Sequence, residues 1–373
     1  MAGRVLSEHL QAIFRSISTR QQCLLQPGSA MPNRRFFYLV PKGGPFREEG
    51  ENRLQYWLRC WRERGQQRPS GGVKVMYQHC DILNRNGFVA IPVHVGGTFS
   101  VDWFPHESQA ISEAKARREC TCDDVVICPE VIPTVTAPFA AERKVAFVQG
   151  WSLVDAGLDG GNYEDHGFTG LLACSQFNRE YMAKRSTLPC PVIRNGIDLT
   201  LFHPPAVPAE PRRVLYVARK NLADALAAID SLPEQIRSRA TFVEHRGPSS
   251  EREMADYYRS ADVFLWTGYP EGFGLPPLEA MACGCAVVGF TGGGGDEFMR
   301  NGSTALTAPD GDTTALGKQL GRILQDDSLK DAIRTAGTAI AQEYTFARME
   351  EDILSFAGTY AGKTASEGGE ARE

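Results

Sequence analysis

The segment YPEGFGLPPLE at residues 269–279 decides the fold class, and it comes shortly after the apolar segment VFLW at residues 263–266. The apolar segment is typical of a buried strand in a parallel sheet. The glycine-rich segment is then expected at the carboxyl end of that strand, where open α/β sheets bind their ligands. Gly272 and Gly274 allow the backbone to approach a ligand closely.

The residues after Gly274 predict a short helix that begins at this ligand edge. Pro276 and Pro277 suit the first turn of a helix, where a missing N–H costs nothing. Gly284 suits the C-terminal cap. The amides of the first turn would then face the ligand, so the sequence predicts a site for a diphosphate.

Glu279 is the unusual residue of this helix, because its neighbours in the sequence LEAMAC are otherwise apolar. A buried carboxylate without a partner is strongly destabilising. Two hypotheses for its partner stay open on the sequence alone. One is a ligand cis-diol that donates two hydroxyl hydrogens, and the other is a structural salt bridge to an arginine.

Apolar segments that alternate with helical segments on both sides of this site predict two α/β domains. A proline-rich linker, HPPAVPAEP at residues 203–211, separates the two series. The predicted strands are residues 35–40, 88–95, 124–130, 144–150 and 170–175, then 212–220, 240–247, 262–266 and 286–290. The predicted parts are an N-terminal helix and connector at 1–30, an N-terminal Rossmann-like acceptor-side domain at 31–203, a C-terminal Rossmann-like nucleotide-sugar-binding domain at 204–345, a helix at 346–361 that packs back on the N-terminal domain, and a disordered tail at 362–373.

Composition narrows the classes of function. The chain has 373 residues with a net charge of −5, so it carries no overall basic field for nucleic acid or an anionic membrane. The sequence contains no run of about 18 apolar residues, so it predicts no membrane span. The ten cysteines include no C-x2-C pair, and scattered thiols favour a reducing cytoplasm. We therefore expect a cytoplasmic protein with no transmembrane segment, for which peripheral membrane contact stays open.

The sequence EGFGLPPLEAMACGCAVV at residues 271–288, in which seven residues separate Glu271 from Glu279, resembles the signature of retaining glycosyltransferase family 4. The resemblance continues through residues 289–312 and through VIRNGIDLTLFHP at 192–204. It extends over roughly residues 170–345 and is weaker over 35–150. It implies the GT-B fold, in which two Rossmann-like domains with mostly parallel sheets face a central cleft.

The resemblance also implies roles for individual residues. Glu279 would bind the ribose of a nucleotide-diphosphate sugar, and Glu271 would contact hydroxyls of the sugar. The resemblance implies two sets of site residues: a catalytic set of Glu271, Lys220 and Arg219, and a donor-binding set of Gly71, Gly72, Arg219, Lys220, Gly272, Phe273, Gly274, Leu275 and Glu279.

The sequence departs from the family pattern at two places. Arg219 and Lys220 are adjacent, whereas many members separate the two cations, so the main diphosphate partner is undecided. Gln149 follows the strand after which many members have a histidine. Its amide could bind the sugar but cannot carry a proton, and a purely structural role is equally compatible.

The expected activity is transfer of a sugar, with retention, from a UDP- or GDP-sugar to a glycan, a lipid-linked intermediate or a small metabolite, as in polysaccharide biosynthesis. No permanently bound cofactor and no metal are expected, because arginine, lysine and a helix N-terminus can stabilise the leaving diphosphate. Asp310 and Asp312 are expected to serve a helix N-cap. A sugar-nucleotide epimerase, a phosphorylase, a transferase acting on nucleic acid and a non-catalytic binding module are the alternatives.

Overall fold

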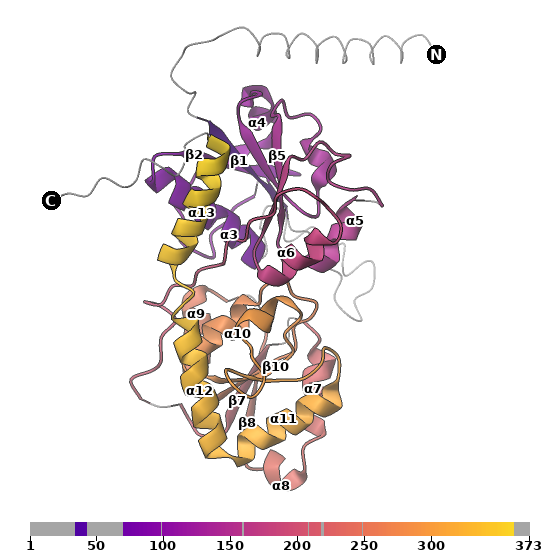
Figure 1. Ribbon diagram of the computed structural model, residues 1–373. Coiled ribbons are helices and arrows are strands. Elements are labelled where there is room, and N and C mark those ends of the chain that lie inside the picture. Colours follow the sequence, from indigo (N-terminus) through magenta and orange to yellow (C-terminus); the bar gives the residue numbers. More distant parts are fainter. Residues whose placement is uncertain are drawn as a thin grey trace, which may run out of the picture.

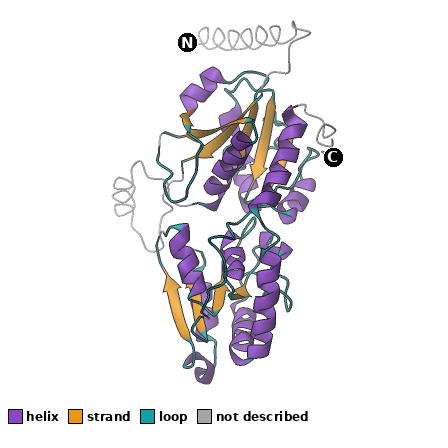
Figure 2. Cartoon of the chain, turned by 90° about the vertical axis from the view of Figure 1, so that its left-hand side faces the viewer, coloured by secondary structure: helices purple, strands orange, loops and turns teal. Residues whose placement is uncertain are grey.

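The computed structural model contains two α/β domains, one above the other in Figure 1 and seen from the side in Figure 2. It describes residues 34–42, 70–97, 99–158, 160–207, 209–217, 220–247 and 249–361. The predicted N-terminal helix at 1–30 and the predicted tail at 362–373 lie outside these residues.

The N-terminal domain is built on a parallel sheet with the strand order β3-β2-β1-β4-β5-β6. Its strands are β1 (Arg35–Pro41), β2 (Val89–Val95), β3 (Ile111–Ser112), β4 (Val125–Pro129), β5 (Arg143–Val148) and β6 (Gly170–Ala173). Its helices are α3 (Gly71–Arg85), α4 (Glu113–Glu119), α5 (Val154–Leu158) and α6 (Gln176–Ala183), with short 3-10 turns at Pro133–Thr136 and Trp151–Leu153. The central strand β1 is fully buried from Phe36 to Val40, as expected of a strand with both faces covered.

The C-terminal domain repeats this plan with a parallel sheet in the order β11-β10-β9-β7-β8. Its strands are β7 (Arg213–Val217), β8 (Thr241–His245), β9 (Val263–Trp266), β10 (Ala286–Gly289) and β11 (Leu306–Thr307). Its helices are α7 (Leu222–Asp230), α8 (Glu234–Arg237), α9 (Glu251–Arg259), α10 (Leu275–Ala282), α11 (Thr313–Gln325) and α12 (Asp327–Ala341), with a 3-10 turn at Gly294–Glu297.

The predicted fold class, two α/β domains with parallel sheets, is confirmed. Each apolar segment that we assigned as a strand forms one. The edge strands β3 and β11 were not predicted, because two residues are too few to show an alternating pattern.

An apolar cluster of buried side chains runs through both domains. It includes Tyr38 and Met76 in the N-terminal domain, Ile197 in the connecting segment, and Phe273 and Met281 in the C-terminal domain. The domains are therefore joined by apolar packing as well as by the chain.

The last helix, α13 (Phe346–Ala361), returns to the N-terminal domain and lies along α3 (Figure 1). The Asn86 amide donates a hydrogen bond of 2.7 Å to the Glu350 carboxylate, and Phe356 is buried in the shared apolar cluster. The chain thus crosses between the domains twice.

The cysteines depart in part from the expectation of free thiols. Cys122 is disulfide-bonded. The free thiols among the described residues are Cys80, Cys120, Cys128, Cys174, Cys190, Cys283 and Cys285.

Of the helices in the described ranges, none combines the length and the apolar character that a membrane span needs.

Candidate functional site

The apolar segment at residues 263–266 forms the strand β9, and the segment that decides the fold class forms a glycine loop and the start of the short helix α10, as the sequence predicts. The loop after β9 ends at Gly274, which has a φ of 97° and is the N-cap of α10, and a proline lies in the first turn of that helix. Gly284, with a φ of 83°, follows the C-cap. Both glycines therefore hold left-handed backbone that other residues adopt only with strain.

The loop before α10 packs directly against the N-terminal domain. A Cβ on Gly272 would overlap the backbone carbonyl of Gln149, and the Ser175 hydroxyl donates a hydrogen bond of 2.7 Å to the Gly272 carbonyl. Only a residue without a side chain allows this approach.

The two glycines that begin α3 reach the same place from the other domain. A Cβ on Gly72 would lie 3.1 Å from the Gln149 amide, and one on Gly71 would lie 3.3 Å from the Leu275 side chain. The structure therefore brings Gly71, Gly72, Gln149 and Leu275 together at the junction, although they are far apart in sequence.

Lys220 and Glu271 form an ion pair on the C-terminal side of this junction. The Lys220 ammonium lies 2.7 Å from the Glu271 carboxylate and donates a second hydrogen bond, of 3.1 Å, to the carbonyl of Pro270. The side chain of Asn221 donates to the carbonyls of Thr267 and Tyr269, which fixes the loop after β9. Arg219 lies outside the described residues, so its share of the diphosphate stays a prediction.

The glycine run at residues 292–295 wraps around Glu271. The Glu271 amide donates to the Gly292 carbonyl at 2.9 Å, and the Gly294 amide donates to the Glu271 carbonyl at 3.0 Å. Trp151 of the N-terminal domain donates its indole N–H to the same Gly292 carbonyl at 3.1 Å. Residues of both domains therefore fix the backbone around Glu271.

The two aspartates before α11 have separate structural roles. Asp312 is the N-cap of α11 and accepts from the Ala315 amide at 2.9 Å, which confirms the predicted capping role. Asp310 instead accepts from the Gly292 amide at 3.1 Å, so it supports the glycine run.

Glu279 is buried, with 8% of its surface exposed, and it faces a lysine from the other domain. One carboxylate oxygen lies 3.5 Å from the Lys74 ammonium, and the other accepts from the Tyr258 hydroxyl at 3.5 Å. Lys74 also forms an ion pair with Glu251 at the start of α9. The structure therefore shows the salt-bridge alternative, with a lysine in place of the arginine, and the role of Glu279 at a ribose stays a prediction.

Burial and charge act in opposite directions on this cluster. Burial raises the pKa of Glu279 above its usual value, although Lys74 works to lower it. Burial alone would lower the pKa of Lys74, but the charges of Glu279 and Glu251 outweigh burial and raise it.

Lys74, Trp151 and Asp310 were not singled out as site residues from the sequence. A signal for Lys74 was present, because a lysine inside the apolar sequence VKVM is out of place on a buried helix face. The contacts of Trp151 and Asp310 with Gly292 had no sequence signal, because they join segments that only the fold brings together.

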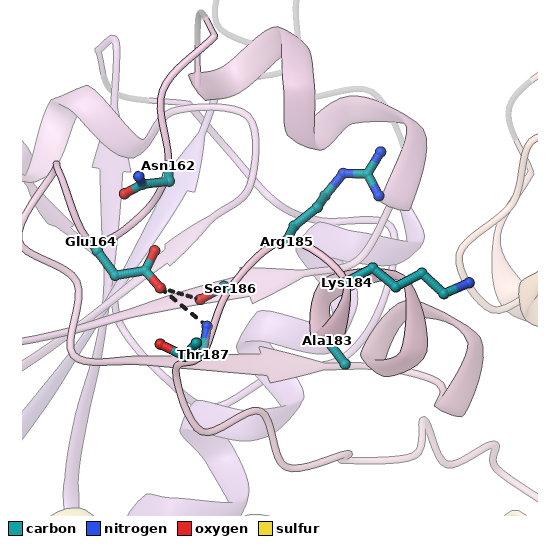
Figure 3. A pocket seen from close by; sticks show the side chains of 7 residues that line it. All are labelled: Asn162, Glu164, Ala183, Lys184, Arg185, Ser186 and Thr187. Carbon is teal, nitrogen blue, oxygen red and sulfur yellow. Dashed lines mark hydrogen bonds between the residues drawn. The ribbon is translucent and has the colours of Figure 1, made fainter.

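The cavity in Figure 3 lies elsewhere, on the N-terminal domain, and has a volume of about 400 Å³. Its lining residues are Asn162, Glu164, Ala183, Lys184, Arg185, Ser186 and Thr187. Glu164 turns toward Ser186 and Thr187, with which it forms hydrogen bonds. None of the predicted site residues lines this cavity.

Across the described part of the chain, no three His, Cys, Asp or Glu side chains are grouped as metal ligands.

Comparison with known proteins finds a family match over a segment that includes most of the C-terminal domain. Residues 192–326 match the family model described as glycosyl transferases group 1. This range includes Lys220, Glu271 and Glu279, and it excludes Gly71 and Gly72. The predicted relationship to GT4-like glycosyltransferases is thereby confirmed for this part of the chain.

Two relatives illustrate the extent of the similarity. A D-inositol 3-phosphate glycosyltransferase of Streptomyces bingchenggensis is 29% identical over 102 residues, which is 27% of this chain and 22% of that protein. The O-antigen chain mannosyltransferase B of Escherichia coli is 30% identical over 109 residues, which is 29% of this chain and 28% of that protein. The similarity therefore spans about a quarter of each relative.

Solved structures share the whole two-domain fold. Sucrose-phosphate synthase of Thermosynechococcus elongatus matches with a TM-score of 0.61 and 16% identity, over 89% of this chain and 100% of that one. The Anabaena protein HepE, solved in complex with UDP-glucose, matches with a TM-score of 0.62 and 16% identity, over 87% of this chain and 99% of that one. The chain has the GT-B fold.

Proposed function

We propose that the protein is a retaining glycosyltransferase that moves a sugar from a UDP- or GDP-sugar to an acceptor. The observation that carries the proposal is the position of the Lys220–Glu271 pair, next to the N-terminus of α10 and at the junction of the two domains. The crystal structure of HepE with UDP-glucose supports a nucleotide-diphosphate sugar as donor, and the names of the matched relatives support glycosyl transfer.

The charges at the junction suit the departure of a nucleoside diphosphate. Cleavage of the bond between the sugar and the phosphate builds negative charge on the leaving oxygen. Lys220, Arg219 and the amide end of α10 would stabilise that charge as it develops. The backbone of Gly272, Phe273, Gly274 and Leu275 would line the sugar and diphosphate, with Gly71 and Gly72 on the opposite side.

Glu271 would bind hydroxyls of the transferred sugar, since its carboxylate accepts from Lys220 and its backbone is held by the glycine run. Gln149 lies next to Gly72 at the start of α3 and next to Gly272 in the loop before α10, and in this proposal its amide orients the sugar without moving a proton. The acceptor would approach from the N-terminal domain. A glycan, a lipid-linked sugar and a small metabolite all fit the proposal, nucleic acid fits less well, and we propose the cytoplasm as the site of action.

The proposed reaction needs no metal, because the cations and the helix N-terminus supply the positive charge. We also propose that the protein has no permanently bound cofactor.

The role of Glu279 predicts a preference for ribonucleotides. In a thermal-shift panel, UDP or GDP should raise the melting temperature, and Glu279→Ala should weaken that binding by about 1–3 kcal/mol, the usual contribution of a hydrogen bond to a charged group. The variant should keep its fold, since Lys74 retains Glu251 as a partner. Equal affinity of wild type and variant for UDP or GDP would refute the ribose role, and a panel without any nucleotide ligand would refute the proposed function.

The role of Lys220 predicts a loss of rate more than of binding. Lys220→Ala should lower kcat by about 100-fold or more while KM for the donor changes much less, because the leaving-group charge is largest in the transition state. Steady-state kinetics with the sugar nucleotide found in the panel measures both. Lys318→Ala, on the surface helix α11, is the matched control. A change confined to KM would show that Lys220 only binds the donor.

Metal independence predicts full activity after treatment with EDTA. Transfer rates measured with EDTA and with added Mg²⁺ should agree within about twofold. The reason is that side chains and a helix N-terminus, and no metal ion, supply the positive charge in the proposed reaction. An absolute requirement for Mg²⁺ or Mn²⁺ would contradict this part of the proposal.

A further inference from the structure

Three buried or half-buried charges meet where α3 of the N-terminal domain touches α9 and α10 of the C-terminal domain. The Lys74 side chain is 8% exposed, that of Glu279 is 10% exposed and that of Glu251 is 22% exposed. One ammonium thus lies between two carboxylates, and the cluster carries a net charge of −1 if all three groups are ionised.

The two carboxylates contact Lys74 differently. Glu251 accepts a close hydrogen bond from the ammonium, whereas the nearest oxygen of Glu279 is 3.5 Å away. The second oxygen of Glu279 is 3.5 Å from the Tyr258 hydroxyl. Both distances are at the long end of hydrogen-bond geometry.

An ionised carboxylate can accept about four hydrogen bonds. Glu279 therefore keeps most of its accepting capacity while its charge is balanced by Lys74. The close bond from Lys74 to Glu251 fixes the ammonium without using the Glu279 oxygens. This geometry balances the charge of Glu279 without filling its hydrogen-bonding positions.

We propose that Lys74 is a positioning residue for donor recognition: it keeps the Glu279 carboxylate charged and correctly oriented to receive the ribose hydroxyls, and Glu251 anchors it. The inference rests on the proposed function and deepens it. Lys74 comes from the N-terminal domain, so the ribose site is complete only when the two domains are packed together. Donor recognition and domain packing are thereby coupled through one side chain.

The titratable groups that interact with the Glu279 carboxylate lie on three helices. They are Lys74 on α3, Glu251 and Tyr258 on α9, and Cys283 next to the end of α10. Lys74 is the cation among them. Its removal leaves burial and Glu251 to raise the pKa of Glu279 further, and the carboxyl group then binds a proton at a higher pH.

The test measures the affinities of wild type and of Lys74→Met for UDP and for 2′-deoxy-UDP. If the panel selects GDP, GDP and 2′-deoxy-GDP are compared instead. At pH 7 the variant should bind the ribonucleotide about tenfold more weakly, while its affinity for the deoxy compound changes much less. As the pH is raised above 7, the ribonucleotide affinity of the variant should recover, because Glu279 regains its charge as pH rises through its raised pKa. Wild type should stay nearly flat over the same range.

Two further variants separate positioning from folding. Lys330→Met is the matched control, since Lys330 is 7% exposed and is paired with Asp262 at 2.9 Å and Asp327 at 2.8 Å, away from the domain junction. It should leave the ribose preference at the wild-type value. Lys74→Arg keeps the charge and should restore most of the affinity lost in Lys74→Met. If the methionine variant does not fold, Lys74→Gln serves in its place.

Each other outcome overturns the inference in a distinct way. An unchanged ribose preference in Lys74→Met would make Lys74 a structural contact between domains only. Tighter binding of the ribonucleotide would show that Lys74 blocks Glu279. If wild type binds no nucleotide at all, it is the proposed function that fails, and the Lys74 variants would not be needed to show it.

Discussion

A buried ammonium between two carboxylates joins the domains of this protein, and the candidate site depends on it. The Lys74 side chain leaves the N-terminal domain and ends between Glu251 and Glu279 of the C-terminal domain. A buried charge without partners is strongly disfavoured, so each of these residues constrains the placement of the others. Tyr258, Leu278 and Ala280 of the apolar cluster lie next to these charges, and a surrounding of low polarity strengthens the interaction.

Close backbone contact is the second constraint on the junction. Side chains at Gly72 and Gly272 would collide with or crowd Gln149, so the loops of the two domains approach each other only because glycine occupies these positions. The polar network around Glu271 lies next to these contacts and includes the Trp151–Gly292 hydrogen bond between domains. Backbone packing and side-chain chemistry therefore specify the same relative placement of the domains.

Much of the fold could be predicted from sequence because its signals are local. Apolar strands, the prolines of α10 and the glycines at residues 274 and 284 each act within a few residues of where they lie. The partners of the charged residues could not be predicted in this way. Glu279 was recognised as a buried acid that needs a cation or a diol, but Lys74 lies 205 positions earlier. Such pairs depend on how the domains pack, which no local pattern encodes.

The two ion pairs of the site differ in burial, and burial explains how they can have different roles. Lys220 and Glu271 keep 36% and 24% of their side-chain surfaces exposed, and a pair in this setting contributes about 1 kcal/mol or less to stability. In the proposed reaction, Lys220 would therefore turn from Glu271 to an arriving diphosphate at little cost. Lys74 and Glu279 are more deeply buried, and separating them would leave an unbalanced charge in an apolar surrounding. The more exposed Lys220 is suited to respond to charge that develops during a reaction, and the buried Lys74 is suited to hold a binding group in place.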